Sequence, residues 1–472
     1  MQNYIINSKH IKLIKIDSEI TLFFHTETMQ IYPINDKELL FFLELFEAKG
    51  EEEILQYYKQ NEVESIKEII NQTLALAPKS IQYVPDENQP TEYNTVVLPM
   101  AAECNLNCPY CFAQTDDGFH FGNFTNDDIA KTLEFVVAEH KSYDRNFFCI
   151  VFFGGEPLLN FESIKFTIEY MKTNYPDFDV FYSITTNGTI LNDDIIKLFS
   201  DHNVAVLVSI DGPDNEYNLR HYRNGKKSLN KVISNIEKLK KNNIRTELRT
   251  TIVNTNPYIC ETFDFLERFE LPFFICFAYP SENKSHTLSS YNNDTLSNIR
   301  KQFDKLLEYY INKFRNKENI YNKRLFDHLS DLRYRNKMGV ACGAGRSYFT
   351  ITANGDIFSC PHFMNDSKYC IGNIDTKLSE NQKYTAVTVE NIKECENCLA
   401  KYFCSGNCLA QKISTGKTNN TASITESCEL MKITFELYIK LFYFAKKYMP
   451  EFFKAESEEK EKLEEQKPQI NC

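Results

Sequence analysis

Hydrophobic and polar positions near the N-terminus follow first a strand pattern and then a helix pattern. Three short β-rich stretches bounded by turn residues are residues 11–16, 20–25 and 29–34. Three stretches with apolar side chains at helical spacing are residues 37–48, 51–59 and 62–77. Three strands followed by three helices predict a small winged-helix-like domain over residues 1–84. The polar, proline-bearing segment 85–94 is typical of a linker.

From residue 95 onward the pattern changes to strands that alternate with amphipathic helices. The expected strands are residues 95–101, 147–153, 179–185, 204–210, 245–253 and 272–278. Expected helices include residues 161–174, 231–242 and 295–314. Six βα units predict a parallel sheet with right-handed crossovers, two units short of a closed eightfold barrel. We therefore expect an α/β fold with a partial (βα)6 barrel over residues 95–335, and a site at the C-terminal ends of its strands.

Cysteines become frequent after Met338. Eight of them fall within ninety residues: Cys342, Cys360, Cys370, Cys395, Cys398, Cys404, Cys408 and Cys428. This density predicts that metal, rather than a large apolar core, organises residues 336–430. Residues 431–472 contain an apolar helix, expected over 433–448, and a charged tail.

Composition narrows the class of protein. The chain has 472 residues and a formal net charge of −12, which disfavours a purely electrostatic nucleic-acid binder. Its apolar runs stop far short of the roughly 18 residues that a membrane span needs, and residues 1–10 do not resemble a signal peptide. We therefore expect a cytoplasmic protein with no membrane partner. In that reducing compartment, 15 cysteines are more plausible as metal ligands or catalytic groups than as disulfides.

A first cysteine cluster directly follows the first expected barrel strand. Cys104, Cys108 and Cys111 are spaced C-x3-C-x2-C in a loop that can turn three thiolates toward one point. Three thiolates leave one iron of a four-iron cluster open to a cofactor or substrate. The alternative is a zinc site, which normally needs four nitrogen or sulfur ligands, and His120 is the nearby histidine that could complete one.

This motif, with Tyr110 before its third cysteine and a βα array behind it, resembles the radical S-adenosylmethionine (SAM) superfamily. After the second strand stands a Gly-Gly-Glu-Pro element formed by Gly154, Gly155, Glu156 and Pro157. In the family it receives the amino group of the cofactor's methionine; glycines allow close backbone approach, while Glu156 and exposed carbonyls accept hydrogen bonds.

The ends of the third and fourth strands extend the resemblance. In the family, residues at and just after the ends of these two strands lie along the cofactor. Ser183 is therefore expected near the ribose of SAM and Arg220 near its carboxylate, which a guanidinium binds well. Asn187 belongs to the same set. Taken alone, Asn187 and its neighbours would be read as turn residues.

The second cysteine field resembles the SPASM domain that follows many radical SAM peptide-modifying enzymes. By position, Cys395, Cys398, Cys404 and Cys428 would fully ligate one auxiliary 4Fe-4S cluster, and Cys342, Cys360 and Cys408 would hold another. Some relatives have a further cysteine where this chain has Tyr348, so Cys370 supplies the fourth ligand or the site is open. Two zinc ribbons are the alternative. The remaining thiols, Cys149, Cys260, Cys276 and Cys472, are interpreted as buried or incidental.

The resemblance implies three 4Fe-4S clusters and SAM, with a reduced first cluster that converts SAM into a 5′-deoxyadenosyl radical able to abstract hydrogen. The resemblance also bears on residues 1–84. Maturases of sulfatases begin almost directly at the three-cysteine motif, whereas this chain has about a hundred residues before it. The strand-then-helix order is similar to the element that recognises leader peptides, in which the third strand takes an extended peptide as an extra strand. A nucleic-acid-binding winged helix is the alternative, but the recognition-helix candidate VESIKEIINQ is not basic.

We therefore predict a radical SAM peptide maturase that joins cysteine sulfur to carbon as thioethers in a ribosomally made precursor peptide. Its partners would be that precursor, with its leader, and an electron donor such as a flavodoxin or ferredoxin, but no nucleic acid. Alternatives are carbon-carbon cross-linking, an anaerobic sulfatase (formylglycine) maturase and, outside enzymes, an iron-sulfur DNA-binding regulator.

Overall fold

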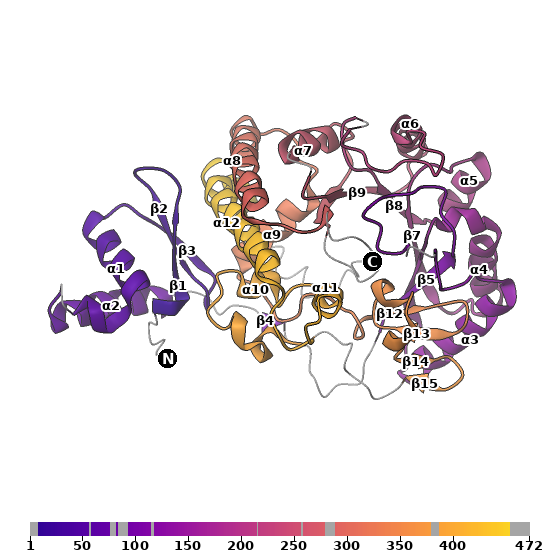
Figure 1. The fold of residues 1–472 in the computed structure, drawn as a ribbon, viewed down its shortest axis with the longest axis horizontal. Coiled ribbons are helices and arrows are strands. Elements are labelled where there is room, and N and C mark those ends of the chain that lie inside the picture. The colour runs from indigo at the N-terminus through magenta and orange to yellow at the C-terminus, as the bar shows by residue number, and fades with distance from the viewer. Residues whose placement is uncertain are drawn as a thin grey trace.

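The computed structural model describes residues 8–55, 58–75, 82–83, 93–114, 118–214, 216–255, 258–278, 288–378 and 387–453. Figure 1 shows the N-terminal strands and helices at one end of the molecule and the βα array at the other. The expected linker lies outside the described residues except for Tyr93 and Asn94, and the charged C-terminal tail lies outside them entirely.

Six parallel strands run side by side in chain order and form the barrel wall. They are β5 (Thr95–Ala101), β6 (Phe147–Gly154), β7 (Asp179–Thr186), β8 (Ala205–Ser209), β9 (Thr246–Ile252) and β10 (Phe273–Phe277). Their order and parallel pairing confirm the partial (βα)6 barrel. Each strand ends within one residue of its expected bounds, because sequences such as FFCIVFFG are apolar on both faces, as a parallel strand covered by helices requires.

Helices lie on the outside of the sheet (Figure 1). Those that connect the six strands are α3 (Asn126–Ser142), α4 (Phe161–Asn174), α5 (Asp193–Asp201), α6 (Leu229–Lys241) and α7 (Ile259–Glu267). Two more, α8 (Asn293–Asn316) and α9 (Lys323–Tyr334), follow β10. Each buries an apolar stripe; in α6 it consists of Val232, Ile236 and Leu239. At the start of α3, Thr125 and Asp128 form a capping box that satisfies free backbone amides.

The barrel sheet continues into the cysteine-rich region. Strand β12 (Tyr348–Ile351) pairs in parallel with β5, and β13 (Asp356–Phe358), β14 (Gly372–Asn373) and β15 (Lys377–Leu378) follow in antiparallel order. The result is one sheet of ten strands, with β5 between β6 and β12. The cysteine-rich region is therefore joined to the barrel by backbone hydrogen bonds.

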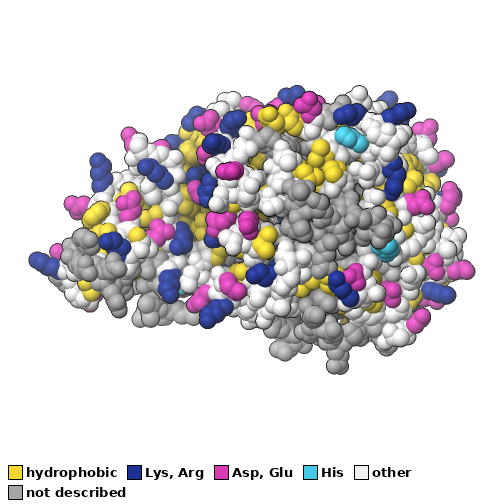
Figure 2. All heavy atoms as spheres, in the orientation of Figure 1, with side chains coloured by type: hydrophobic (Ala, Val, Ile, Leu, Met, Phe, Trp, Pro, Cys, Tyr) yellow, Lys and Arg dark blue, Asp and Glu magenta, His cyan; other side chains and the backbone are white. Residues whose placement is uncertain are grey.

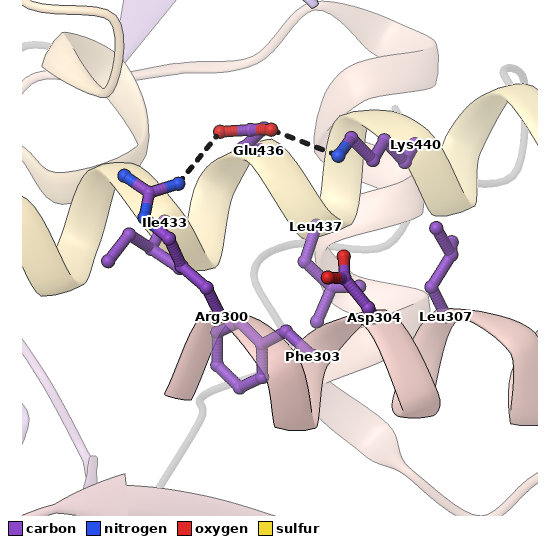
Figure 3. Close-up of a pocket in the computed structure, with 8 residues that line it drawn as sticks. All are labelled: Arg300, Phe303, Asp304, Leu307, Ile433, Glu436, Leu437 and Lys440. Atoms are coloured by element: carbon purple, nitrogen blue, oxygen red, sulfur yellow. Dashed lines mark hydrogen bonds and ion pairs between the residues drawn. The ribbon is translucent and has the colours of Figure 1, made fainter. Parts of the chain in front are cut away.

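A long C-terminal helix, α12 (Thr425–Tyr448), packs along α8 (Figure 3). Ile433 and Leu437 of α12 face Phe303 of α8 across a small groove. Above them, Glu436 pairs with Lys440 at 3.0 Å and with Arg300 at 3.5 Å. The helix begins eight residues before the expected position, because its first two turns, TESCELMK, are largely polar and carry no apolar stripe. Those turns place Cys428 on a helix.

The N-terminal unit consists of an antiparallel sheet and two helices: β1 (Ile11–Lys15), β2 (Thr21–His25), β3 (Gln30–Ile34), α1 (Lys37–Ile54) and α2 (Gln60–Ala75). The prediction of three helices was wrong. Helix α1 continues through Gly50, so the segment expected as a separate helix over 51–59 begins inside it. A single glycine weakens a helix by only about 1 kcal/mol, which neighbouring good helix formers can outweigh.

The N-terminal sheet is buried on both faces. Phe23 packs with the helices of its own unit, whereas Leu22 and Phe24, on the opposite face, join the main core. Phe24 meets Phe435 of α12 edge-to-face, with ring centroids 5.5 Å apart. In addition, β4 (Gln82–Tyr83) pairs in parallel with β11 (Lys337–Met338). The unit is therefore docked against the rest of the protein.

A half-buried carboxylate completes this junction. Glu27, in the turn between β2 and β3, accepts hydrogen bonds from Lys401 Nζ and Tyr402 Oη, both at 2.9 Å, and Lys337 lies 3.9 Å away. Burial by itself would raise the pKa of Glu27, but Lys401, Tyr402 and Lys337 outweigh it and hold the pKa below its ordinary value. The ionised carboxylate therefore stabilises the docked arrangement.

On the face shown in Figure 2, acidic and basic side chains are interspersed rather than gathered by sign. Among the helices of the described residues, none has the length and apolar content required to cross a bilayer.

The Glu27 junction leads to a prediction about stability. The substitution Glu27→Gln should lower the free energy of unfolding by about 1 kcal/mol at neutral pH, because it removes the charge that Lys401 and Tyr402 bind. Since the folded pKa is lowered, this contribution is fully present above the unfolded pKa and is lost as the pH falls through the folded value. Thermal unfolding of both proteins should therefore converge as the pH drops below about 4.3. Equal effects from Glu19→Gln, at an exposed position, would contradict this reasoning.

Candidate active site and metal centres

The three thiols of the first cluster lie at the wall of a cavity at the C-terminal ends of the barrel strands. The cavity has a volume of about 210 Å³, and Cys104, Cys108 and Cys111 all line it. Burial raises the pKa of Cys104 to about 11 and raises that of Cys108 further. Thiolates are thus unfavourable here unless a cation compensates them. Three thiols beside a cavity, one of them buried and two half-buried, fit a cluster with one iron open to a bound molecule.

The Gly-Gly-Glu-Pro loop after β6 packs directly on the backbone that precedes Cys104. Gly154 has φ +134°, and a Cβ on Gly155 would lie 2.2 Å from the carbonyl oxygen of Glu103. The backbone amide of Glu156 donates to that same carbonyl at 2.7 Å. Only glycine allows this approach. Pro157 then begins a short 3-10 turn, so the loop is fixed against the cysteine loop.

The Glu156 carboxylate has a structural role. It is fully buried and accepts hydrogen bonds from the backbone amide of Asn187 at 2.7 Å and the hydroxyl of Thr186 at 2.8 Å. Burial raises its pKa to about 7, although these bonds oppose the shift. The Glu156 oxygens therefore hold the loop after β7, and it is Gly154 and Gly155 of this element that line the cavity.

The side chain of Asn187 links the loop after β7 to the loop that carries Cys104. Its side-chain amide donates to Asn105 Oδ1 at 2.8 Å and lies 3.7 Å from Cys104 Sγ. Ser183 does not line the cavity, whereas Thr185, two residues further along the same strand face, does. Ser209, at the end of β8, lines it as well.

The site also contains a buried ionic network around Asp211. Asp211 Oδ1 pairs with Arg220 Nε at 3.0 Å and accepts from the backbone amide of Thr251 at 3.2 Å. Tyr110 donates its hydroxyl hydrogen to Asp211 Oδ2. A guanidinium has five N–H donors, and Arg220 lines the cavity, so donors remain for a ligand carboxylate. Asp211 therefore positions both side chains.

The far wall of the cavity was not anticipated. It includes Arg249 of β9, Cys276 of β10 and His362, which follows Cys360 by two residues. The His362 ring stacks on Phe112 with centroids 3.5 Å apart, and burial, aided by Arg249, lowers its pKa to about 3. Cys276 lies one residue before the end of β10, which was an available signal, whereas Arg249 lies in the middle of β9. Nothing in the local sequence marked His362.

The four cysteines expected to form one auxiliary set come together in space. Cys395, Cys398, Cys404 and Cys428 line a single small cavity beside α10 (Lys401–Cys404). Burial raises the pKa of Cys395 to about 11, and Cys398 and Cys428 add to the effect by like-charge repulsion. Such a set is stable as thiolates only with bound metal charge.

The second expected set also assembles. Cys408 acts electrostatically on both Cys342 and Cys360, and burial raises the pKa of these two thiols. The Tyr348 hydroxyl hydrogen-bonds to Cys342 and Cys360. By contrast, the Cys370 thiol donates to the carbonyl of Gly372 at 3.0 Å. Within the described part of the chain, no three His, Cys, Asp or Glu side chains are arranged to hold a single metal ion.

Comparisons with known proteins agree with this arrangement. The family model of the radical SAM superfamily matches residues 98–266, and that of the SPASM iron-sulfur cluster-binding domain matches residues 342–399. An uncharacterized protein of Methanocaldococcus jannaschii is 30% identical over 284 residues, which cover 60% of this chain and 89% of the relative. A cysteine-type anaerobic sulfatase-maturating enzyme of Clostridium novyi is 28% identical over 74% of this chain and 96% of its own.

One further sequence relative and two solved structures are also similar to this chain. The radical SAM cyclopropyl synthase TigE of Paramaledivibacter caminithermalis is 25% identical over 80% of this chain and 78% of its own. The solved structure of anSMEcpe with bound AdoMet has a TM-score of 0.60 at 19% identity and covers 76% of this chain and 97% of that one. SuiB of Streptococcus suis has a TM-score of 0.50 at 15% identity, with 88% and 98% covered. The chain therefore belongs to the radical SAM superfamily, among the members that carry a SPASM domain, and its cofactors are SAM and 4Fe-4S clusters.

Proposed function

We propose that this protein is a peptide maturase that forms thioether cross-links between a cysteine sulfur and a carbon of a precursor peptide. The observation that carries the proposal is the cavity where the three-cysteine loop, the barrel strand ends and the segment after Cys360 meet. One chamber thus combines the radical SAM motif with the SPASM region. Relatives named for sulfatase maturation and cyclopropyl synthesis, and an anSMEcpe structure with a bound Cp18Cys peptide, support a peptide as the substrate.

The proposed ligands follow the three thiol groups. Cys104, Cys108 and Cys111 would hold the cluster that binds SAM; Cys395, Cys398, Cys404 and Cys428 would hold one auxiliary cluster; Cys342, Cys360 and Cys408 would hold the other. When bound, the first cluster and SAM supply a carbon radical that removes a hydrogen atom from an unactivated carbon.

The residues around the cavity orient the bound molecules and exclude water. Asp211 holds Arg220 in place, and Arg220 binds the SAM carboxylate. Glu156 fixes the loop of Asn187 from behind, since its carboxylate is bonded to that loop. The stacked rings of Phe112 and His362 close one side of the cavity. A dry, shaped chamber of this kind keeps a reactive carbon from side reactions.

Thioether formation in particular is supported by the surroundings of Cys342, Cys360 and Cys408. The fourth group at this set is the phenol of Tyr348 rather than a thiol, and Cys370 is bonded elsewhere. A substrate cysteine presented beside this set would be close to metal charge that keeps it deprotonated. Carbon-carbon cross-linking is the second candidate, supported by the similarity to TigE, which is named as a cyclopropyl synthase.

We further propose that the N-terminal unit binds the leader of the precursor. Strand β3 is at the edge of its sheet and contains Pro33, which suits an edge strand because proline cannot donate to a ladder. Three of the seven large hydrophobic side chains that are exposed among the described residues belong to this unit: Phe41, Leu55 and Ile69. An extended peptide could pair with β3 and cover apolar side chains on the helices.

Iron content tests the ligand sets. Anaerobically reconstituted protein should hold about twelve irons. Replacing Cys104, Cys108 and Cys111 by Ala should remove about four and abolish SAM cleavage. Cys260→Ala, on α7 and outside the three sets, is the matched control and should change neither quantity. Zinc in place of iron would refute the assignment. Iron loss in Cys370→Ala would make Cys370 the fourth ligand, whereas full iron would leave that position open to the substrate.

Mass spectrometry tests the reaction. Precursor incubated with enzyme, SAM and a reductant should lose about 2 Da per cross-link, because one hydrogen leaves carbon and one leaves sulfur. The linked cysteine should resist alkylation, and deuterium on the acceptor carbon should appear in 5′-deoxyadenosine. The same mass loss with every cysteine still alkylatable would instead indicate carbon-carbon cross-linking. Oxidation of a sulfatase Cys or Ser, with the precursor unchanged, would indicate a formylglycine maturase.

Leader recognition can be tested by single substitutions that keep the sheet docked. Ile69→Asp, at a side chain that is 63% exposed, should weaken binding of the leader severalfold and slow modification, while SAM cleavage without peptide stays unchanged. Tyr143→Asp, at a 39% exposed aromatic outside this unit, is the control. Unchanged leader affinity in both Ile69→Asp and Phe41→Asp would exclude a role for the exposed apolar side chains of this unit in leader binding.

A further inference from the structure

Lys412 is a buried cation in the cysteine-rich region. It lies on the short helix α11 (Leu409–Ser414), and only 3% of the residue is exposed to solvent. Its ammonium donates to the carbonyl oxygen of Asn419 at 2.8 Å. Among the described residues, no carboxylate lies within ion-pair distance of it. Burying a charge without a counter-charge is strongly unfavourable, so negative charge must come from other groups around this side chain.

Thiols of both auxiliary sets lie near enough to Lys412 to act electrostatically on its ammonium. Cys395 and Cys404 of the four-cysteine set act electrostatically on it, and so do Cys408 and Cys342 of the other. Its position is fixed, because its backbone amide donates to the carbonyl of Cys408 at 3.1 Å, one helical turn earlier. A Cβ placed on Gly406, which lines the four-cysteine cavity, would lie 3.7 Å from the Lys412 nitrogen.

Neighbouring lysines show that this situation is particular to Lys412. Lys401 lines the four-cysteine cavity, but its ammonium is bonded to Glu27 at 2.9 Å. Lys432 lies near Cys428 and is bonded to Glu429 at 2.7 Å. The charge of each of these lysines is therefore already balanced by a carboxylate, whereas for Lys412 the nearby groups able to carry negative charge are the thiols.

We propose that Lys412 is the shared counter-cation of the two auxiliary metal sites and raises the reduction potentials of both clusters. The inference rests on the ligand sets proposed above. A cluster held by thiolates carries net negative charge that grows on reduction, so a fixed cation nearby favours the reduced form. Because the cation is buried, solvent and salt screen it little. Both clusters thereby become better electron acceptors.

The test uses the full chain with Ala at Cys104, Cys108 and Cys111, so that only auxiliary signals remain. Iron content and EPR-monitored reduction potentials are measured after anaerobic reconstitution for Lys412→Gln, Lys412→Met and Lys412→Arg. Glutamine keeps a hydrogen-bond donor without the charge, and arginine keeps the charge with a different shape. The control is Lys417→Met, one turn further on and exposed.

Both neutral variants should keep their iron and show auxiliary potentials shifted to more negative values, while Lys412→Arg and Lys417→Met stay close to the parent. Loss of auxiliary iron in both neutral variants but not in Lys412→Arg would also support the proposal, because arginine shares the charge rather than the shape. Unchanged potentials in Lys412→Gln, or iron loss in Lys412→Arg as well, would overturn it. A parent protein without auxiliary iron would instead refute the ligand sets, and this inference with them.

Discussion

The structure depends on the burial of strand β5 between two parallel neighbours. Its residues from Val96 to Ala101 are all buried, with β6 on one side and β12 on the other. The loop that leaves its C-terminal end carries Cys104, and the strand at its other edge belongs to the cysteine-rich region. Hydrogen bonds along both edges hold β5 firmly, so the first cysteine loop starts from a rigid position.

Around this strand, the buried charges of the site are arranged so that protein groups satisfy them. Asp211 meets Arg220, and the carboxylate of Glu156 meets the amide of Asn187. Such pairs fix side chains and loops because a broken partner would leave an uncompensated buried charge. The thiol sets and Lys412 are the exceptions. With the ligand sets proposed above, the 4Fe-4S clusters would complete the charge balance, and metal binding would be coupled to the folding of this region.

The N-terminal sheet packs against the rest of the protein, although the sequence pattern suggested a separate unit. Alternation along β2 sends Phe23 toward its own helices and Phe24 toward α12, and Glu27 ties the next turn to Lys401. The unit therefore stands beside the helix that carries Cys428 and the loop that carries Lys401. A peptide bound at the edge of this sheet would be held by the same framework as the auxiliary sites.

The sequence by itself determined the barrel strands and the three-cysteine loop, because each is encoded locally: apolar runs of fixed length mark buried strands, and short cysteine spacings mark ligand loops. The division of the later cysteines into two sets was implied by the resemblance to the SPASM domain. Only the tertiary structure decided the rest. It turned Glu156 inward, put Tyr348 rather than Cys370 beside Cys342, and brought His362 into the barrel cavity. Contacts between residues far apart in the chain depend on how the strands pair and on which partners remain for a buried polar group. Neither can be read from a local sequence pattern.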